Sequence, residues 1–546
     1  MFLGIDVGTN GARALVCDDQ GEVIAHAEEP FALRSAPALP PGWFEQWADD
    51  WWTATVACLC RVTQALQQAG RAPAAIRGIS VTSTSGTVCL VDAKGDVLGP
   101  ALMYNDGRAT AEAEEVNRAG VALADKLGYR FAASFALPKL LWLRRHEPER
   151  FRAARYFISP TDFIVGRLTG RFDVSDYSNA LKTGYDLIEE RWPDFIEAEL
   201  GIPIGHLPKV VAPGTPVGAV TGAAAAETGL TAETPVLAGM TDGCASQVST
   251  AAVAPGQWNS TLGTTLVIKG VTRALLRDPS GAVYCHRHPD GYWLPGGASN
   301  TGGEGIARNF EPTRLDALNA AALACAPTDL IVYPLARPGE RFPFARPEAR
   351  GFAVPFPAGE RGGGQGAVGG QVPLPLGLPS RTGVPPVFAA RTVAAKTGWR
   401  GSAPDGALRQ DLPLPKGGEE ATLYTACLEG VGYVERLAYE TLAGLGAEVG
   451  DAIYVAGGAN SSAAWLQIRA DILGKTLRVP AAGGGAMGAA IVAASRTAYT
   501  GIIPAARAMV RIVQEIHPRP ALQTAYDERY ACFCAVCRER GYLDPI

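Results

Sequence analysis

Residues 2–28 read FLGIDVGTNGARALVCDDQGEVIAHAE. Short apolar runs separated by a small-residue turn predict two strands joined by a tight turn, with a third strand hairpinned onto them. Asp6 closes the first strand. Gly8, Asn10 and Gly11 follow, and these residue types adopt a positive φ at the lowest cost. We therefore expect the chain to begin with a β-hairpin whose turn is rich in small residues.

The composition of this turn also suits a phosphate-binding loop. Backbone N–H groups of Gly8, Thr9 and Asn10, together with the Thr9 hydroxyl, can point at one anion. The Asp6 carboxylate at the edge of the turn is placed to hold Mg²⁺, because hard divalent cations prefer oxygen ligands and bind with substrate phosphates. An ordinary β-hairpin with a Gly-rich turn explains the same residues, so the turn alone leaves both interpretations open.

A second copy of the pattern lies in the other half of the chain. Residues 256–269 read GQWNSTLGTTLVIK, again a strand, a Gly-Thr turn and a strand. Gly263, Thr264 and Thr265 form this second turn. Two phosphate-binding hairpins on two half-chains suggest one nucleotide held between two similar domains.

With these two hairpins the chain resembles the sugar and polyol kinases named for their FGGY signature. The resemblance implies an α/β fold with two ribonuclease-H-like, actin-like ATPase domains and an active-site cleft between them. It also implies ATP and Mg²⁺ as cofactors, with Asp6 as the metal ligand and as a contact to the sugar. We expect a sugar-binding domain over residues 1–236 and an ATP-binding domain over residues 237–546.

Length and composition limit the function classes. The 546 residues include 47% hydrophobic residues, enough for more than one core. A net charge of −5 gives no basic field for nucleic acid or anionic lipid, so we expect a small-molecule partner. No apolar run has the length of a membrane span and no basic leader precedes the first strand, so a cytoplasmic location is expected. Eleven cysteines fit reduced thiols better than a disulfide framework. Oligomeric state is left open.

Two further turns carry groups that suit a polyhydroxylated ligand. Residues 76–92 predict strand, turn and strand, and the turn presents hydroxyls that can both donate and accept. Residues 103–109, Met-Tyr-Asn-Asp-Gly-Arg-Ala, cluster an amide, a carboxylate and a guanidinium. A Ser/Thr turn between strands needs no ligand, so packing remains an alternative. In the kinase family the second segment contributes to the sugar site, which implies Ser85, Tyr104 and Asn105 as sugar contacts here.

These segments also separate subfamilies. Xylulokinases carry Gln-Met-His-Gly where this chain has Thr-Ser-Thr-Ser-Gly-Thr, so Ser85 stands near the place of the usual histidine. The cyanobacterial and plant-type D-ribulose kinases carry Asp-Gly-Thr-Ser-Gly-Thr. Four other segments match them: 175–185, 283–286, 291–303 and 339–343. The resemblance therefore favours phosphorylation of D-ribulose to D-ribulose 5-phosphate, with D-xylulose or a polyol as the alternative.

Asp242 is the candidate general base. An apolar run from residue 236 delivers this carboxylate to a glycine-flanked helix start. Capping of the helix N-terminus would explain an aspartate there without any catalytic role. In the family, the catalytic aspartate lies in a Gly-x-x-Asp segment shortly before the second phosphate hairpin. The resemblance thus implies that Asp242 contacts the sugar and accepts its hydroxyl proton.

The resemblance also supplies an adenosine motif in residues 453–474. A strand there opens onto Gly457 and Gly458, where the absence of a Cβ lets the backbone approach a nucleotide. Trp465 would stack on the adenine, and Gly302 and Gly303 complete the implied nucleotide contacts. The chain departs from the family pattern at two positions, where it has Ala459 and Ser462.

Two clusters and one segment are expected to be structural. Cys285, His286 and His288 resemble metal ligands but lack a fourth partner, so packing is favoured. The same holds for three cysteines between 532 and 537. Residues 352–418 are dense in Pro and Gly and are expected to form an inserted surface loop, mostly disordered. Deletion of about residues 356–414 is expected to leave fold and activity largely intact.

Outside the sugar kinases, the same fold serves as an ATP-driven scaffold or as a degenerate kinase kept as a sugar sensor. The hydroxyl-bearing turns argue against a scaffold. The presence of Asp242 argues against a degenerate kinase.

Overall fold

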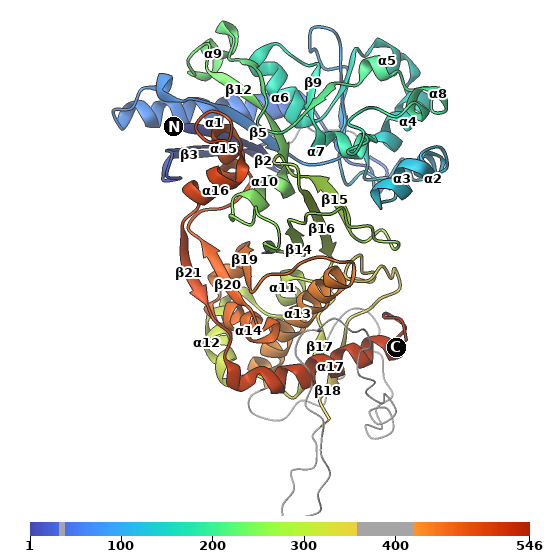
Figure 1. Cartoon of the computed structure of the whole chain (residues 1–546), viewed down its shortest axis with the longest axis vertical. Helices are drawn as coiled ribbons and strands as arrows, with labels where there is room; N and C mark the ends of the chain where they lie inside the picture. The colour runs from blue at the N-terminus through green and yellow to red at the C-terminus, as the bar shows by residue number, and fades with distance from the viewer. Residues whose placement is uncertain (32–38, 358–418, 546) are drawn as a thin grey trace, which may run out of the picture.

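The computed structural model describes residues 1–31, 39–357 and 419–545. Two α/β lobes lie one above the other, with the N-terminal half of the chain in the upper lobe and most of the C-terminal half in the lower one (Figure 1). Each lobe is built on one large sheet with helices packed against it. The predicted pair of ribonuclease-H-like domains is confirmed.

The upper sheet has the order β11-β12-β5-β1-β2-β3. β1 pairs antiparallel with β2 and parallel with β5, so the opening hairpin forms the centre of the sheet. Its strands are β1 Phe2–Val7, β2 Gly11–Cys17, β3 Val23–Pro30, β5 Ile79–Ser83, β11 Pro216–Ala219 and β12 Pro235–Thr241. The predicted strand-turn-strand pattern over residues 2–28 is thereby confirmed.

Alternation along β1 divides its side chains between two helical layers. Leu3, Ile5 and Val7 belong to the core beneath α1 (Ala48–Gln68), whereas Phe2 packs in a separate core with α15 (Gly485–Ala494). α6 (Pro160–Thr169) and α9 (Gly222–Thr228) lie beside α1, and α10 (Asp242–Val248) lies beside α15. The sheet is therefore covered on both faces.

The lower sheet repeats the same topology. Its order is β15-β16-β14-β13-β19-β20-β21, so the run β16-β14-β13-β19-β20 corresponds to β3-β2-β1-β5-β12. The first three strands of each run pair antiparallel and the last three pair parallel. The strands are β13 Trp258–Leu262, β14 Leu266–Gly270, β15 Tyr284–Arg287, β16 Trp293–Ser299, β19 Ala452–Ala456, β20 Thr476–Pro480 and β21 Ile512–Ile516. The two hairpins recognised in the sequence thus occupy equivalent places.

Smaller elements complete both lobes. The upper lobe adds α2 Thr110–Ala119, α3 Val121–Leu127, α4 Ala136–His146, α5 Pro148–Ala153, α7 Tyr177–Ala180, α8 Phe195–Ala198, and the strand pairs β4 Glu45–Gln46 with β7 Ala101–Leu102, β6 Cys89–Val91 with β8 Tyr156–Ile158, and β9 Val174–Asp176 with β10 Lys209–Val211. The lower lobe adds α11 Gly303–Asn309, α12 Leu315–Cys325, α13 Glu419–Gly444, α14 Ala463–Leu473, α16 Ile502–Met509, α17 Gln523–Glu539 and the pair β17 Leu330–Tyr333 with β18 Phe352–Pro355. Among the described helices, none combines the length and the apolar character that crossing a bilayer requires.

The chain crosses between the lobes more than once. The boundary expected between residues 236 and 237 falls inside β12, which pairs in parallel with β5 of the upper sheet. α15, far along the chain, also packs on β1 and β5, and Figure 1 shows this red helix against the blue strands. The expected boundary is therefore wrong at β12, because strand order depends on pairing partners distant in sequence.

The first residues of the segment expected to be an inserted loop form a strand. Residues 352–355 form β18, which pairs antiparallel with β17, and Phe352 and Ala353 are buried there. Residues 358–418, which hold nearly all of the predicted loop, lie outside the described residues.

Candidate active site

Asp6 is a buried carboxylate at the centre of the upper sheet. Its side chain lies 3.5 Å from the Arg13 guanidinium, the residue opposite it on β2, and the whole residue is 8% exposed. Burial and the negative charge of Asp242 raise the pKa of Asp6 to about 6, although Arg13 opposes this shift. Gly485, at the start of α15, faces it so closely that an added Cβ would lie 2.7 Å from the carboxyl carbon. Asp6 is therefore held between a strand and a helix start.

The turn after Asp6 is braced from within and from outside. The Gly8 amide donates to the carbonyl of Gly11 at 3.0 Å, so this N–H is used inside the hairpin and is not available to the phosphate that the sequence predicted for it. The Thr9 hydroxyl donates to the Tyr104 hydroxyl at 3.4 Å, and the Gln46 side chain donates to the Thr9 carbonyl at 2.7 Å. The turn is thereby tied to the segment that carries Tyr104.

Asp242 is the first residue of α10, directly after β12, as the sequence predicted. Its carboxylate accepts a hydrogen bond from the Gly243 amide at 2.6 Å. Burial raises the pKa of Asp242 above its usual value, while the Gly243 amide, Lys182 and Lys269 act in the opposite direction. A buried carboxylate with a raised pKa is a stronger base than one in water.

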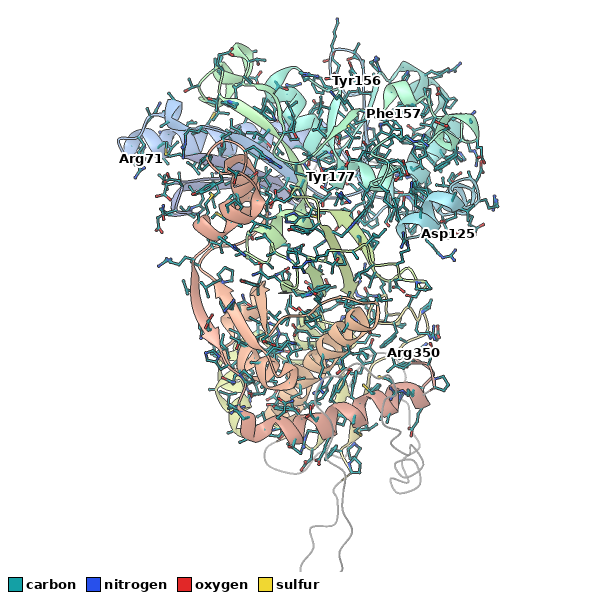
Figure 2. All side chains as sticks on the ribbon, in the orientation of Figure 1. Arg71, Asp125, Tyr156, Phe157, Tyr177 and Arg350 are labelled. Carbon is teal, nitrogen blue, oxygen red and sulfur yellow. The ribbon has the colours of Figure 1, made fainter. Side chains whose placement is uncertain are left out.

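Asp242 opens into a pocket with a volume of about 210 Å³ that draws on both lobes. The pocket is lined by Thr84, Ser85, Tyr104, Lys182, Thr241, Asp242, Gly243, Lys269, Tyr284 and His286. Figure 2 shows Tyr177, three residues after β9 begins, at the junction of the lobes, where α7 contacts β15. A pocket therefore lies where the site is expected, and Ser85, Tyr104 and Asp242 of the expected set line it.

Asn105 and Asp6 are not among these lining residues. Asn105 is exposed and lies in the turn directly after Tyr104. The predicted sugar contact by Asn105 is therefore not supported. The negative charge of Asp242 contributes to the raised pKa of Asp6.

Of the hydroxyls in the turn after β5, the Ser85 hydroxyl alone is left without a partner among the described residues. Ser83 pairs with Thr161 at 2.7 Å, and Thr84 pairs with Thr87 at 3.0 Å. The carbonyls of the turn are held by two amines. Lys182 Nζ donates to the Ser85 carbonyl at 3.2 Å and Lys139 Nζ to the Gly86 carbonyl at 3.0 Å.

Two pocket residues are cations that sequence patterns did not indicate. Lys182 follows α7, and Lys269 lies on β14, where it is 9% exposed. Burial opposes the charge of Lys269, but Cys244, Tyr284 and Asp242 together raise its pKa above the usual value. Both cations favour the ionised form of Asp242. Lys182 lies in the matched segment 175–185 and Lys269 at the end of the second hairpin motif, but neither pattern assigned them a role, and the fold brings both to the carboxylate.

The Asn-Asp-Gly-Arg segment has a supporting role. Asp106 is 1% exposed, accepts from the Phe44 amide at 2.7 Å and pairs with Arg108 at 2.8 Å. Arg108 also pairs with Glu45 at 2.8 Å and lies over the Trp43 ring at 3.9 Å. These charges are used within the protein and hold the Tyr104 turn in place.

The second hairpin is braced by a helix start, as the first is. The Gly303 amide donates to the Gly263 carbonyl at 2.8 Å. An added Cβ at Gly302 would lie 2.6 Å from the Thr264 carbonyl oxygen. The Gly263 amide donates to the Thr265 carbonyl at 3.0 Å. Gly302 and Gly303 therefore support the turn through their backbones, and the amides of Gly263 and Gly303 are not available to the predicted nucleotide.

Gly457 and Gly458 lie at the end of β19, beside this hairpin. Gly457 has a φ of 97°, and an added Cβ would lie 2.3 Å from the Leu262 carbonyl oxygen. A Cβ at Gly458 would meet nothing within 4 Å. The backbone at Gly458 is thus accessible, in agreement with the predicted approach of a nucleotide.

Trp465 does not fit the predicted stacking on adenine. It is 6% exposed within the core of the lower lobe, and its indole N–H donates to the Leu428 carbonyl at 3.3 Å. α14 packs against α13, and the indole ring of Trp465 is used in this helix packing. The prediction for Trp465 is therefore wrong.

The Cys-His-x-His cluster also differs in part from its predicted packing role. No group of three or more His, Cys, Asp or Glu side chains in the described parts of the chain could hold a metal ion. Cys285 and His288 are buried, in agreement with packing, whereas His286 lines the pocket. Cys532, Cys534 and Cys537 are buried on α17, as expected for structural thiols.

Comparison with known proteins places these features in a family. Residues 1–249 match the model of the FGGY family of carbohydrate kinases, N-terminal domain, and residues 382–497 match the C-terminal domain model of that family. The first match ends after α10, so it includes β12 and Asp242.

Individual kinases resemble this chain in sequence and in structure. The xylulose kinase of Escherichia coli (strain K12) is 30% identical over 299 residues, which cover 54% of this chain and 59% of that protein. The chain thus matches well under two thirds of that relative's length. The crystal structure of xylulose kinase from Rhodospirillum rubrum superimposes with a TM-score of 0.78 at 26% identity, covering 98% of both chains. A xyloylose kinase from Brucella ovis gives 0.79 at 25% identity, covering 100% of both.

Proposed function

The chain belongs to the FGGY family of carbohydrate kinases, and from this premise we propose that it transfers the γ-phosphoryl group of ATP to a hydroxyl of a ketopentose. The pocket that carries the proposal has a buried carboxylate, Asp242, at its wall and unpaired polar atoms on both sides. Hydroxyl-bearing ligands suit such a lining, because each hydroxyl can donate and accept.

In the proposed reaction Asp242 accepts the proton of the attacking hydroxyl. The raised pKa of this carboxylate, caused by burial, increases its strength as a base. Lys182 and Lys269 keep the carboxylate ionised before the reaction. After proton transfer, the same cations face a neutral carboxylic acid and are free to attract the anionic product.

Asp6 is the residue that would hold Mg²⁺. Its carboxylate is buried and its pKa is raised beside the charge of Asp242, so a divalent cation would relieve a repulsion that Arg13 offsets only in part. One or two carboxylates together with phosphates are the usual protein environment of this ion. When bound, Mg²⁺ neutralises charge on the transferring phosphoryl group.

Nucleotide binding is proposed for the side of the site formed by the lower lobe. The turn of residues 263–265 and the accessible backbone at Gly458 lie at adjacent strand ends, β13 and β19. Thr9 and Asn10 in the upper hairpin and Thr264 and Thr265 in the lower one supply further groups for phosphate. Closure of the lobes around both substrates would exclude water and limit ATP hydrolysis.

D-Ribulose is the first candidate substrate. Ser85 takes the place where xylulokinases have a histidine, and its hydroxyl lacks a partner among the described residues, so it can bind the sugar. D-Xylulose is the second candidate, and the names of the similar kinases from E. coli and R. rubrum favour it. An ATP-driven scaffold or a sugar sensor would not need a base at the pocket.

A coupled assay of ADP release over a panel of pentuloses, hexuloses and polyols tests the proposal. We expect a ketose to raise ADP release well above the sugar-free rate, with kcat/KM for D-ribulose at least tenfold above that for D-xylulose. Ser85→Ala should reduce this preference mainly through the better substrate. An equal or reversed preference would contradict the choice of D-ribulose, and no response to any sugar would contradict the kinase proposal.

A further inference from the structure

His286 is a buried polar side chain that the proposed reaction does not use. It lies on β15, opposite Leu294 of β16, and is 2% exposed. Its ring lines the same pocket as Asp242, beside the Tyr284 ring at 5.3 Å. Neither ring nitrogen has a hydrogen-bond partner among residues 1–31, 39–357 and 419–545.

The neighbouring His288 differs in part, because one of its ring nitrogens is paired and only its Nε2 lacks a partner among the described residues. His288 is 1% exposed, and its Nδ1 accepts the Asp290 amide at 2.9 Å. His288 does not contribute to the pocket lining. Burying an imidazole without partners costs free energy, and the cost is recovered when a ligand supplies them. Both nitrogens of His286 are unpaired and its ring lines the pocket, and this combination, which His288 lacks, indicates a ligand contact.

The charges around His286 define the chemistry of that ligand. Burial, followed by Lys269 and Lys182, lowers the pKa of His286 well below its usual value, so the ring is neutral. No carboxylate is among the groups that shift it. A neutral imidazole offers one donor and one acceptor. A hydroxyl or a carbonyl matches such a ring better than a phosphate, which favours cationic partners.

The unpaired hydroxyl of Ser85 lies in the same pocket and belongs to the upper lobe, whereas His286 belongs to the lower lobe. We propose that His286 is a specificity-determining residue, which hydrogen-bonds one oxygen of the ketose from the lower lobe while Ser85 binds another from the upper lobe. This inference rests on the proposed function, since it names a residue of the same site. The bound sugar would thus connect the two lobes.

Replacement of His286 by leucine tests the proposal. Leucine removes the unpaired nitrogens, so the folded protein should be as stable as the wild type or more stable. We expect the KM for the ketose to rise at least tenfold while the KM for ATP changes less than twofold. His286→Gln, which keeps a donor and an acceptor, should give an intermediate KM. These constants are measured by the coupled assay, with thermal unfolding of each variant.

His288→Leu is the matched control. It removes an equally buried imidazole outside the pocket, so it should lower the unfolding temperature and leave the ketose KM within twofold of the wild type. A folded His286→Leu enzyme with an unchanged ketose KM would overturn the proposal, because the ring would then be only a packing group.

Binding measured without turnover separates this inference from the proposed function. D-Ribulose, D-xylulose, ribitol and xylitol are titrated calorimetrically into the wild type and His286→Leu in the absence of ATP. If the wild type binds a sugar but never phosphorylates it, the kinase proposal fails, and the affinity ratio of the two proteins still decides the role of His286. Failure of the wild type to bind any of the four sugars at millimolar concentration would overturn the role of His286.

Discussion

The two hairpins at the centres of the two sheets share a backbone and differ in charge. When Gly8 is aligned with Gly263, Asp6 corresponds to Thr261. Asp6 is a buried carboxylate with a raised pKa, whereas the Thr261 hydroxyl donates to Asn259 within its own strand at 3.3 Å.

The residues opposite these two positions differ in the same way. Arg13 faces Asp6 across the upper hairpin, and Val267 faces Thr261 across the lower one. At these equivalent positions the upper hairpin therefore carries a pair of opposite charges, whereas the lower hairpin carries an uncharged pair. The repeated fold supplies two similar turns, and the charged one belongs to the lobe that also carries Asp242.

Loss of Asp242, the proposed general base, should have the largest effect. We expect Asp242→Asn and Asp242→Ala to lower kcat by a factor of about 10² to 10⁴, because a positioned general base contributes that much. ATP and sugar affinities, measured by calorimetry, should be retained. Activity above about a tenth of the wild-type kcat in either variant would show that Asp242 is not the base.

Separate substitutions of Asp6 and Thr261, the equivalent residues at which the two hairpins differ, test the comparison directly. Asp6→Asn should lower kcat/KM at least tenfold and raise the Mg²⁺ concentration needed for half-maximal activity, because the proposed metal ligand is lost. Thr261→Val is the matched control at the equivalent, uncharged position of the lower hairpin and should change kcat/KM less than about threefold. Titration of Mg²⁺ against initial rates measures both. Equal effects of the two substitutions would refute the proposed difference between the hairpins.

The charge of Asp6 should also be visible in the pH dependence of stability. The pKa of Asp6 is about 6 in the folded chain, against an ordinary value of 3.8, so the folded state binds more protons between these values. Stability therefore falls as pH rises through this window, and the full cost is present above about pH 6. Asp6→Asn removes the cost and should stabilise the protein by roughly 3 kcal/mol near neutral pH, with little gain near pH 4.

Chemical unfolding of Asp6→Asn and the wild type across this pH range measures the difference. Thr261→Val again serves as the control, since its effect should not depend on pH. A constant difference between Asp6→Asn and the wild type at every pH would mean that Asp6 does not titrate in this window.

The glycines that brace the hairpins should give the smallest effects. Gly485→Ala places a Cβ against Asp6, and Gly302→Ala places one against the Thr264 carbonyl. Each should cost roughly 1–3 kcal/mol of stability, because neighbouring atoms must move. Gly485→Ala should act mainly on the Mg²⁺ requirement, and Gly302→Ala on the KM for ATP. Gly458→Ala, which meets nothing within 4 Å, is the stability control.

Local patterns predicted the parts of the site that are continuous in sequence. The turn after Asp6, the turn at Gly263 and the helix start at Asp242 each consist of a strand, small residues and a change of direction. These features lie within a few residues of one another. Turn chemistry and strand periodicity were therefore enough to locate them.

Features that depend on long-range pairing could not be predicted in this way. Lys182, Lys269 and His286 come from three separate elements and meet only because the two lobes do. β12 joins the upper sheet by pairing with β5, which is distant in sequence. For Trp465, residue type suggested a ligand contact, but the side of α14 on which it lies determines that it is buried. The prediction that Trp465 stacks on adenine came from the family resemblance, and the burial of its ring contradicts it.

The position of α15 has a consequence for how the protein is made. All ten residues of this helix, Gly485–Ala494, are buried, and they cover the face of the upper sheet that carries Phe2 and Gly4. A ribosome releases the first strands long before it has synthesised this helix. Until about residue 494 has left the exit tunnel, that apolar face has no native cover, so the emerging chain depends on chaperones or on delayed folding to avoid aggregation.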